Sequence, residues 1–324
     1  MADDQVSYPD TFPMPPLSRP AEVAELLIGA IDLHCHSGPA AMPRILDHHE
    51  ELLDAGAAGF RAVLYKDHFY PGMAHAIILE KLFPELGVRL YSGVALNNAS
   101  GGINPHAVDH AIKLNGKIVW MPTLSAANHI NVLASGKAKT FPKTSKKMLD
   151  AEPLTALDAN GKLTDDTKKV IDLIAEADII LAGGHLHVSE QHVMFEEAAR
   201  RGVKKMMVNH PTYIVDFKDS DIRQLVGLGV KMEHSICMFI KGKSEKFSAD
   251  DLAHLIEVAG VDNTILSSDL GLLGSQRPVD GFRSVVQMLL DLQMPRADIK
   301  KLISENAAAF LDLPAIGAAG QNAA

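Results

Sequence analysis

Residues 31–39 read I-D-L-H-C-H-S-G-P, a short apolar run that ends in two histidines, His34 and His36, separated by one residue. In a β-strand, side chains two residues apart point to the same face, so we expect these imidazoles to project together from a strand end. Histidine is a common metal ligand, so this pair can begin a metal site. The alternative is a chance pair of histidines in a turn, and the rest of the chain decides between them.

Short apolar segments alternate with helix-like segments along the rest of the chain. The expected strands are 31–36, 60–66, 88–94, 117–123, 179–185, 204–210, 230–234 and 263–269. The expected helices are 46–55, 74–83, 105–114, 165–177, 189–201, 219–228, 249–259, 280–292 and 296–311. Such alternation predicts a parallel α/β sheet, and eight units match a (β/α)8 TIM barrel. A doubly wound open sheet is the alternative.

Polar residues fall at the ends of the expected strands, which favours the barrel. A barrel brings the carboxyl ends of its strands to one face, where barrel enzymes carry their chemistry. The residues at these ends are His34, His36, Lys66, His68, His185, His210, Glu233, His234 and Asp269. We therefore expect them to converge on one site.

Length and composition fit one large domain. The chain has 324 residues, of which 47% are apolar and 22% charged, and α/β barrels of this length fold as single domains. We expect a proline-rich arm and short helix over 1–29, a barrel over 30–313 and a flexible tail over 314–324. Residues 125–164, after the fourth strand, lack a helix–strand rhythm. They predict a lid-like insertion, because long loops in compact domains usually cover binding sites.

Charge and targeting signals limit the classes of partner. The formal net charge is −9, which argues against nucleic acid and anionic membranes as partners and favours a small-molecule substrate. No apolar run is long enough to span a membrane, and the N-terminus resembles no secretory signal. With two cysteines, no disulfide framework is expected. We expect a cytoplasmic protein, and the proline-rich arm suggests a homo-oligomer.

Several of these motifs together resemble the amidohydrolase superfamily of metal-dependent hydrolases. They are D-L-H-C-H at the first strand, G-G-H and V-N-H-P at the fifth and sixth strands, and S-S-D-L-G at the eighth. The last helix, S-E-N-A-A-A-F-L-D-L, is also similar to the helix that ends such barrels. The resemblance covers roughly residues 30–313. More narrowly, D-L-H-C-H-S-G-P, Y-K-D-H, V-W-M-P-T and S-S-D-L-G resemble a little-characterised subgroup.

The resemblance implies a divalent metal held by strand-end residues. The implied ligands are His34, His36, His185, His210 and Asp269. Zinc is the expected ion, with manganese or iron as alternatives, and one or two ions are expected. By the same resemblance, Asp269 takes a proton from the metal-activated water and His210 binds a second metal or orients the substrate. A site with a few N and O ligands and an open position suits catalysis.

Lys66 marks a departure from the superfamily pattern. Two-metal members carry a carboxylated lysine or a glutamate, often on the fourth strand, but here that strand reads V-W-M-P-T. Lys66, at the end of the second strand, is a candidate for that group. Alternatively, Lys66 is an ammonium that binds a substrate carboxylate or pairs with Glu233 or Asp67. We expect a catalytic role for Lys66 in either form.

Other polar residues near the strand ends are candidate substrate contacts. Amides and glycines over 97–102 suit a carbonyl or carboxylate, although a turn before the next helix explains them equally well. The basic run 137–147 suits an anionic substrate, although solvated lysines are the simpler interpretation. The candidates are His68, Asn97, His129, His187, Glu233 and His234.

These observations predict a metal-dependent hydrolase of amide- or ester-type bonds. Its substrate is expected to be a small amide, lactam, imide or lactone, cleaved at a C–N or C–O bond by an activated water. The nearest alternative is a metal-dependent non-oxidative decarboxylase, which the same superfamily contains. A catalytically inert metal-binding protein is the alternative outside enzymes.

Overall fold

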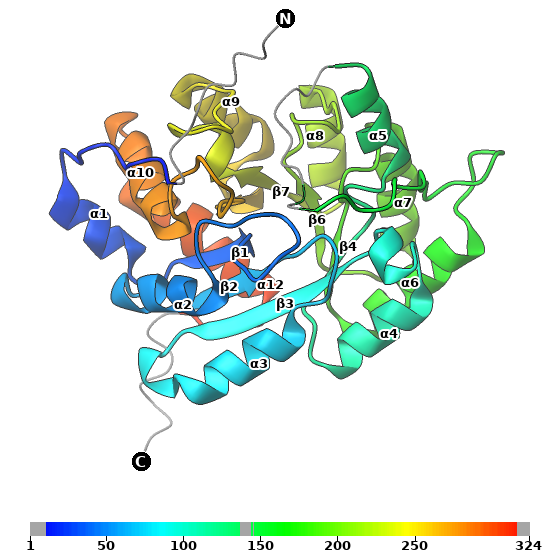
Figure 1. The fold of residues 1–324 in the computed structure, drawn as a ribbon. Coiled ribbons are helices and arrows are strands. Elements are labelled where there is room, and N and C mark those ends of the chain that lie inside the picture. The colour runs from blue at the N-terminus through cyan, green and yellow to red at the C-terminus, as the bar shows by residue number, and fades with distance from the viewer. Residues whose placement is uncertain (1–10, 137–143, 145, 316–324) are drawn as a thin grey trace, which may run out of the picture.

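Eight parallel strands curl into a barrel at the centre of the protein (Figure 1). The computed structural model describes residues 11–136, 144 and 146–315. The strands are β1 (Ile31–Cys35), β2 (Ala62–Tyr65), β3 (Arg89–Ala95), β4 (Ile118–Trp120), β5 (Ile180–Ala182), β6 (Met206–Asn209), β7 (Val230–Ser235) and β8 (Thr264–Ser267). Each strand pairs with the next in chain order. The expected (β/α)8 barrel is therefore confirmed, and the open doubly wound sheet is excluded.

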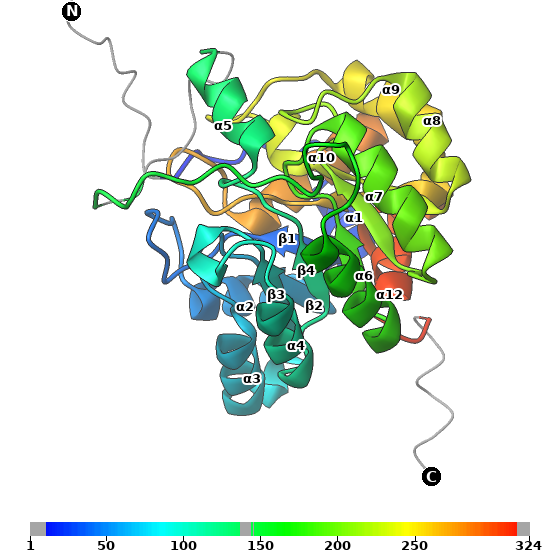
Figure 2. The same ribbon diagram turned by 90° about the vertical axis from the view of Figure 1, so that its right-hand side faces the viewer.

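Helices surround the strands in the expected alternation (Figures 1 and 2). They are α1 (Pro20–Leu27), α2 (His48–Ala57), α3 (Met73–Leu82), α4 (Pro105–Lys113), α5 (Ala127–Ala134), α6 (Asp165–Ala177), α7 (Val188–Arg200), α8 (Asp219–Gly227), α9 (Ala249–Ala259), α10 (Pro278–Asp291), α11 (Arg296–Lys300) and α12 (Asn306–Phe310). Short 3-10 turns lie at Pro84–Leu86, Asn98–Ser100, Ile236–Met238 and Val261–Asn263, and a π-helical turn at Lys301–Glu305 joins α11 to α12. None of the helices in the described part of the chain is long and apolar enough to cross a bilayer.

Local sequence sets where several helices begin. Asp47 caps α2 and Ser248 caps α9, each in a capping box with an acidic residue three positions later. Pro105 and Pro278 occupy the first turns of α4 and α10, where a missing N–H costs nothing. These signals explain why most expected helix starts lie within two residues of the observed ones.

The inner faces of the strands form a separate apolar cluster that α12 completes. Ile31, Leu64 and Trp120 are fully buried in this cluster, together with Phe310 of α12. Because α12 packs on the inward-facing strand residues, it closes the barrel at the end opposite the polar strand ends. The barrel interior is therefore a packed core, and the polar site lies at one end of it.

An irregularity in β1 turns two successive residues inward. The register between β1 and β2 shifts between Asp32 and Cys35. Leu33 packs in the inner cluster, the next residue His34 also faces inward, and Cys35 packs outside. A bulge of this kind re-aims a side chain at a functional site.

Asp32 and Ser268 tie β1 to β8, which closes the barrel. The Asp32 Oδ1 atom accepts from the backbone N–H groups of His34 (3.0 Å) and Ser268 (2.9 Å). The Asp269 N–H donates to the His34 carbonyl at 2.6 Å. The loops that follow β1 and β8 also lie together on one side of the barrel in Figure 2. Gly271 is required there, because a Cβ at its position would overlap the His36 carbonyl oxygen.

The segment 125–164 contains one helix that the sequence did not predict. Helix α5 occupies its first part, and Leu157 and Leu163 pair around an Asn-Gly turn. Seven residues of the basic run, 137–143, and residue 145 lie outside the described residues. The arm residues 1–10 and the tail residues 316–324 also lie outside them, whereas Phe12 donates its N–H to Ser275 after β8.

Candidate metal centre

His34, His36 and Asp269 bring three donor atoms to one point. The His34 Nε2 atom lies 3.2 Å from the Asp269 Oδ1 atom, and the His36 Nε2 atom lies 3.1 Å from the same oxygen. All three donor atoms lie within 4.8 Å of one another. Residues more than two hundred positions apart in the sequence thus meet where β1 and β8 end.

Both imidazoles are oriented by partners on their other nitrogen. The His34 Nδ1 atom lies 3.2 Å from the Glu233 Oε2 atom, and the His36 Nδ1 atom lies 2.9 Å from the Lys66 carbonyl oxygen. Each partner is an acceptor, so each Nδ1 carries the proton and each Nε2 presents a lone pair. Outer partners of this kind are typical of metal-bound histidines.

The donor set fits a divalent cation. In a tetrahedral site, metal–ligand bonds of about 2.0–2.2 Å place neighbouring donors about 3.3–3.6 Å apart, close to the 3.2 and 3.1 Å distances to Asp269. Burial lowers the pKa of His36 to about 3, so this imidazole is neutral. Burial alone would raise the pKa of Asp269, but His34 and His36 hold it well below its usual range. Positive charge at this point therefore stabilises the ionised Asp269 carboxylate, and a cation held by the three donors would supply such charge.

Lys66 lies beside the three donors and is almost completely buried. Its Nζ atom is 3.0 Å from the His34 Nε2 atom and 5.2 Å from the Trp120 ring centre. Burial lowers the pKa of Lys66 to about 8. Asp67 instead pairs with Arg44 at 3.4 Å. Lys66 therefore loses its proton more readily than an ordinary lysine, but at neutral pH it remains mostly an ammonium group beside the donor set.

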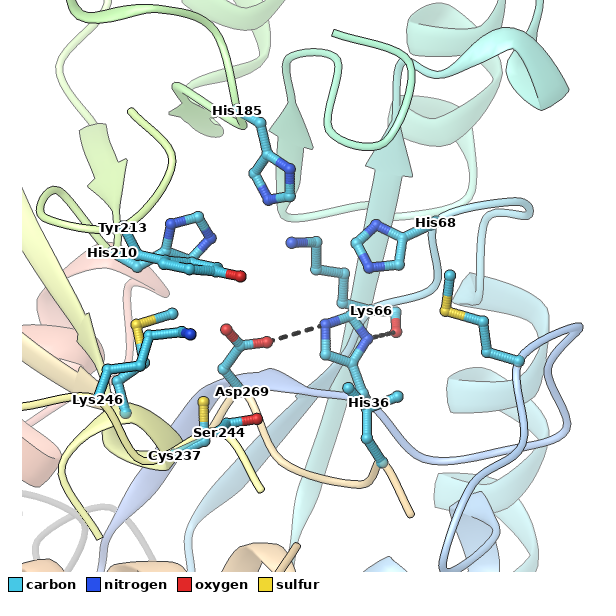
Figure 3. Close-up of a pocket in the computed structure, with 13 residues that line it drawn as sticks. His36, Lys66, His68, His185, His210, Tyr213, Cys237, Ser244, Lys246 and Asp269 are labelled. Carbon is cyan, nitrogen blue, oxygen red and sulfur yellow. Dashed lines mark hydrogen bonds and ion pairs between the residues drawn. The ribbon is translucent and has the colours of Figure 1, made fainter. Parts of the chain in front are cut away.

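A pocket of about 640 Å³, its open mouth included, lies above these residues. Its walls come from the ends of β1, β2, β5, β6 and β8 and from the loop after β7. In Figure 3, His36, Lys66, His68, His185, His210 and Asp269 surround one space. The described parts of 125–164 do not line this pocket, so the expected lid role of that segment stays a prediction.

His185 and His210 lie across the pocket from His36. Their ring centres are 5.0 Å apart, and the His210 ring centre lies 6.3 Å from that of His34. Burial lowers the pKa of both, so both are neutral. His129, on α5, contacts His185 with an Nδ1–Nδ1 distance of 2.8 Å. The two pocket histidines lie outside the group formed by His34, His36 and Asp269.

His210 and Asp269 adopt unusual backbone conformations. Their φ angles are 32° and 50°, in the left-handed region that residues with side chains rarely occupy. Such strain is often concentrated at functional sites, because the surrounding structure enforces a needed side-chain direction. His210 directly follows β6 and Asp269 lies two residues after β8, and both side chains line the pocket.

The other expected substrate residues have diverse positions. His68 lines the pocket and stacks on His36, with ring centres 4.9 Å apart. The Asn97 side chain forms hydrogen bonds with His68, Thr123 and Ser125, so it joins the ends of β2, β3 and β4. His187 caps the start of α7, away from the pocket lining.

The adjacent residues of β7 point in opposite directions. Glu233 is buried and also accepts from Asn209 at 2.9 Å, so it supports His34 from behind. His234 is buried against the ring of Phe239 and does not line the pocket. The alternation of β-strand side chains explains why only one of the two faces the barrel interior.

Sequence reasoning missed several residues of the site. Tyr213 and Lys246 line the pocket from the loops after β6 and β7, and Asp32 holds the β1–β8 junction. Asp32 is the one with a local signal, since a charged residue inside the apolar run of β1 is unusual. Tyr213 and Lys246 lie in loops without periodicity, and only the fold brings them to the site.

A family model described as "Family of unknown function (DUF6282)" matches residues 29–233. The chain belongs to the DUF6282 family. The region matched in this DUF6282 protein includes His34, His36, Lys66 and Glu233, whereas Asp269 lies beyond it. A comparison with curated proteins finds no match.

Solved structures with the same fold include hydrolases and a decarboxylase. An amidohydrolase from Pseudomonas aeruginosa is 13% identical with a TM-score of 0.58, and the alignment covers 90% of this chain and 98% of that one. The probable dipeptidase PvdM from Pseudomonas aeruginosa is 12% identical with a TM-score of 0.61, covering 90% and 96%. A 2,6-dihydroxybenzoate decarboxylase is 11% identical with a TM-score of 0.50, covering 88% and 100%. The predicted resemblance to amidohydrolases is thus confirmed for the fold of this DUF6282 protein.

Proposed function

We propose that the protein is a metal-dependent hydrolase that cleaves a C–N or C–O bond in a small amide, lactam, imide or lactone. The observation that carries the proposal is the convergence of the His34 Nε2, His36 Nε2 and Asp269 Oδ1 atoms at the base of a pocket. That pocket opens at the carboxyl ends of the strands, where barrel enzymes carry their active sites.

The ion implied by this donor set would be held by His34, His36 and Asp269, and zinc suits two imidazoles and one carboxylate. Manganese and iron are the alternatives, and His185 with His210 would serve a second ion. When bound, such an ion lowers the pKa of a water and polarises a carbonyl group.

The chain's own residues supply the proton transfers and orient the substrate. Asp269 is ionised at neutral pH and accepts a proton from the attacking water. It then returns the proton to the leaving nitrogen or oxygen. Lys66 and His210 both line the pocket and stabilise negative charge that develops on the carbonyl oxygen.

A combined metal and activity assay tests the proposal. We expect the purified protein to bind zinc and to hydrolyse a member of a small amide and lactone library. His34→Ala should lose the metal. Asp269→Asn should lower kcat at least about a hundredfold, the typical contribution of a general base. Asp250→Asn, an exposed position on α9, is the matched control and should leave both readouts unchanged.

Isotope labelling separates the hydrolase from its nearest alternative. In water enriched in oxygen-18, a hydrolase incorporates one labelled oxygen into the product acid. Release of carbon dioxide without incorporation of labelled oxygen would support a decarboxylase. Two lysines of the pocket, Lys66 and Lys246, also suit decarboxylation, because they attract the carboxylate of a substrate. Metal binding without turnover of any substrate would support an inert metal-binding protein.

A further inference from the structure

Lys246 enters the pocket from the loop that follows β7. It lines the same space as His36 and Asp269. In Figure 3, its ammonium group and the hydroxyl group of Tyr213 both point toward the centre of that space. Neither residue belongs to the donor set at the base of the pocket.

The position of Lys246 is fixed from two sides. Its backbone N–H donates to the Met238 carbonyl at 2.8 Å, which holds the loop against the 3-10 turn after β7. Its Nζ atom lies 4.8 Å from the centre of the Tyr213 ring. Tyr213 is itself anchored, because its N–H donates to the His210 carbonyl at 2.9 Å. A cation held over an aromatic face is attracted by the ring, so this placement is favourable.

The charge of Lys246 is not compensated by a carboxylate in the described part of the chain. The neighbouring Lys241, in contrast, pairs with Glu245 at 2.6 Å. The carboxylate that lines the pocket is Asp269, and it is already engaged by His34 and His36. In a protein of net charge −9, an ammonium group that faces a pocket without an acidic partner favours an anionic ligand.

Tyr213 adds a second donor beside Lys246. Burial raises the pKa of Tyr213 to about 12, so its hydroxyl keeps its proton at neutral pH. An ammonium and a hydroxyl together offer one donor to each oxygen of a carboxylate. A phosphate has three terminal oxygens and is usually held by a larger set of donors or by a planar guanidinium.

We propose that Lys246 and Tyr213 bind a carboxylate of the substrate, remote from the bond that is cleaved, and so select small anionic substrates. This inference rests on the proposed function, because it takes the base of the pocket as the reacting end. Lys246 and Tyr213 thus act as specificity residues.

Binding calorimetry with defined probes tests the inference. The probes are succinate, its uncharged diamide succinamide, acetate and inorganic phosphate, each titrated into zinc-loaded and into chelator-treated protein. We expect succinate to bind at least about tenfold more tightly than succinamide and more tightly than phosphate in both forms. Lys246→Met should raise the Kd of succinate about tenfold but change the Kd of acetate less than twofold, because acetate occupies the base of the pocket.

Control variants separate specific recognition from general charge. Lys243→Met removes the same charge from the same loop outside the pocket lining and should change the Kd of succinate less than twofold. Lys246→Arg should restore binding to within about threefold. The inference is overturned if Lys246→Met binds succinate as tightly as the wild type, if Lys243→Met weakens binding equally, or if succinamide or phosphate binds as well as succinate.

The two proposals fail in different ways. Absence of any bound divalent metal, or of any hydrolysis, contradicts the proposed function, whereas the titrations of chelator-treated protein still decide the role of Lys246. Conversely, the protein could hydrolyse uncharged substrates at a rate that Lys246→Met does not change. That result would support the proposed hydrolase and would contradict the inference that its substrates are anionic.

Discussion

Replacement of Glu233 tests the proposed role of His34 without touching a donor atom. The Glu233 Oε2 atom accepts from both the His34 Nδ1 atom (3.2 Å) and the Asn209 Nδ2 atom (2.9 Å), and the carboxylate is fully buried. Glu233→Gln can keep both hydrogen bonds but loses the charge that makes the imidazole a stronger ligand. Loss of such an outer partner typically weakens metal binding 10–100-fold. We expect about tenfold for Glu233→Gln, or about 1.4 kcal/mol, and about a hundredfold for Glu233→Ala.

Competition with a chromophoric chelator measures the zinc affinity of each variant. Glu257→Gln, which removes one exposed carboxylate from α9, is the control and should bind zinc like the wild type. The free energy of unfolding of the metal-free variants shows whether the substitution merely damages the fold. If both Glu233 variants bind zinc with the wild-type affinity, Glu233 does not orient a metal ligand, and the assignment of His34 as a ligand is wrong.

Two further predictions concern the fold that supports the site. Asp32→Ala removes the acceptor for the N–H groups of His34 and Ser268. It should lower the free energy of unfolding by about 1–3 kcal/mol in a denaturant titration. A variant as stable as the wild type would show that the Asp32 side chain does not stabilise the junction of β1 and β8. Burial lowers the pKa of His234 from 6.5 to about 4, so the folded state binds fewer protons than the unfolded state between these pH values. The stability contributed by neutral His234 is therefore complete above about pH 6.5 and is lost as the pH falls toward 4, by up to about 3 kcal/mol. His234→Gln should reduce the dependence of the free energy of unfolding on pH between about 4 and 6.5 in the metal-free protein. If this dependence is unchanged, His234 is not the group responsible for it.

Periodicity in the sequence was sufficient to predict the barrel because strands and helices alternate with clear local signals. The helix at 249–259 was predicted with the observed bounds, and its Ser248 capping box explains why. Helix α5 was missed because it lies in a segment whose apolar residues show no clear repeat. Its buried residue, His129, packs toward His185, so tertiary contacts rather than a hydrophobic stripe hold the helix.

The sequence was less informative about the pocket than about the donor set. His34, His36 and Asp269 end strands, and parallel strands in a barrel must bring their ends together. The roles of Glu233 and His234 could not be separated, because the facing of a strand residue depends on register, and a shift of one position reverses it. Tyr213 and Lys246 come from loops whose paths depend on the packing of the whole barrel.

The hydrogen bond from the Asp269 N–H to the His34 carbonyl links the assembly of the three donors to the closure of the barrel. The third donor belongs to the last strand, and the same contact that positions it also joins the two edges of the sheet. A nascent or partly unfolded chain with an open barrel presents two histidines and no assembled triad. Under the proposed function, an ion that needs all three donors would therefore bind only after the last strand has docked.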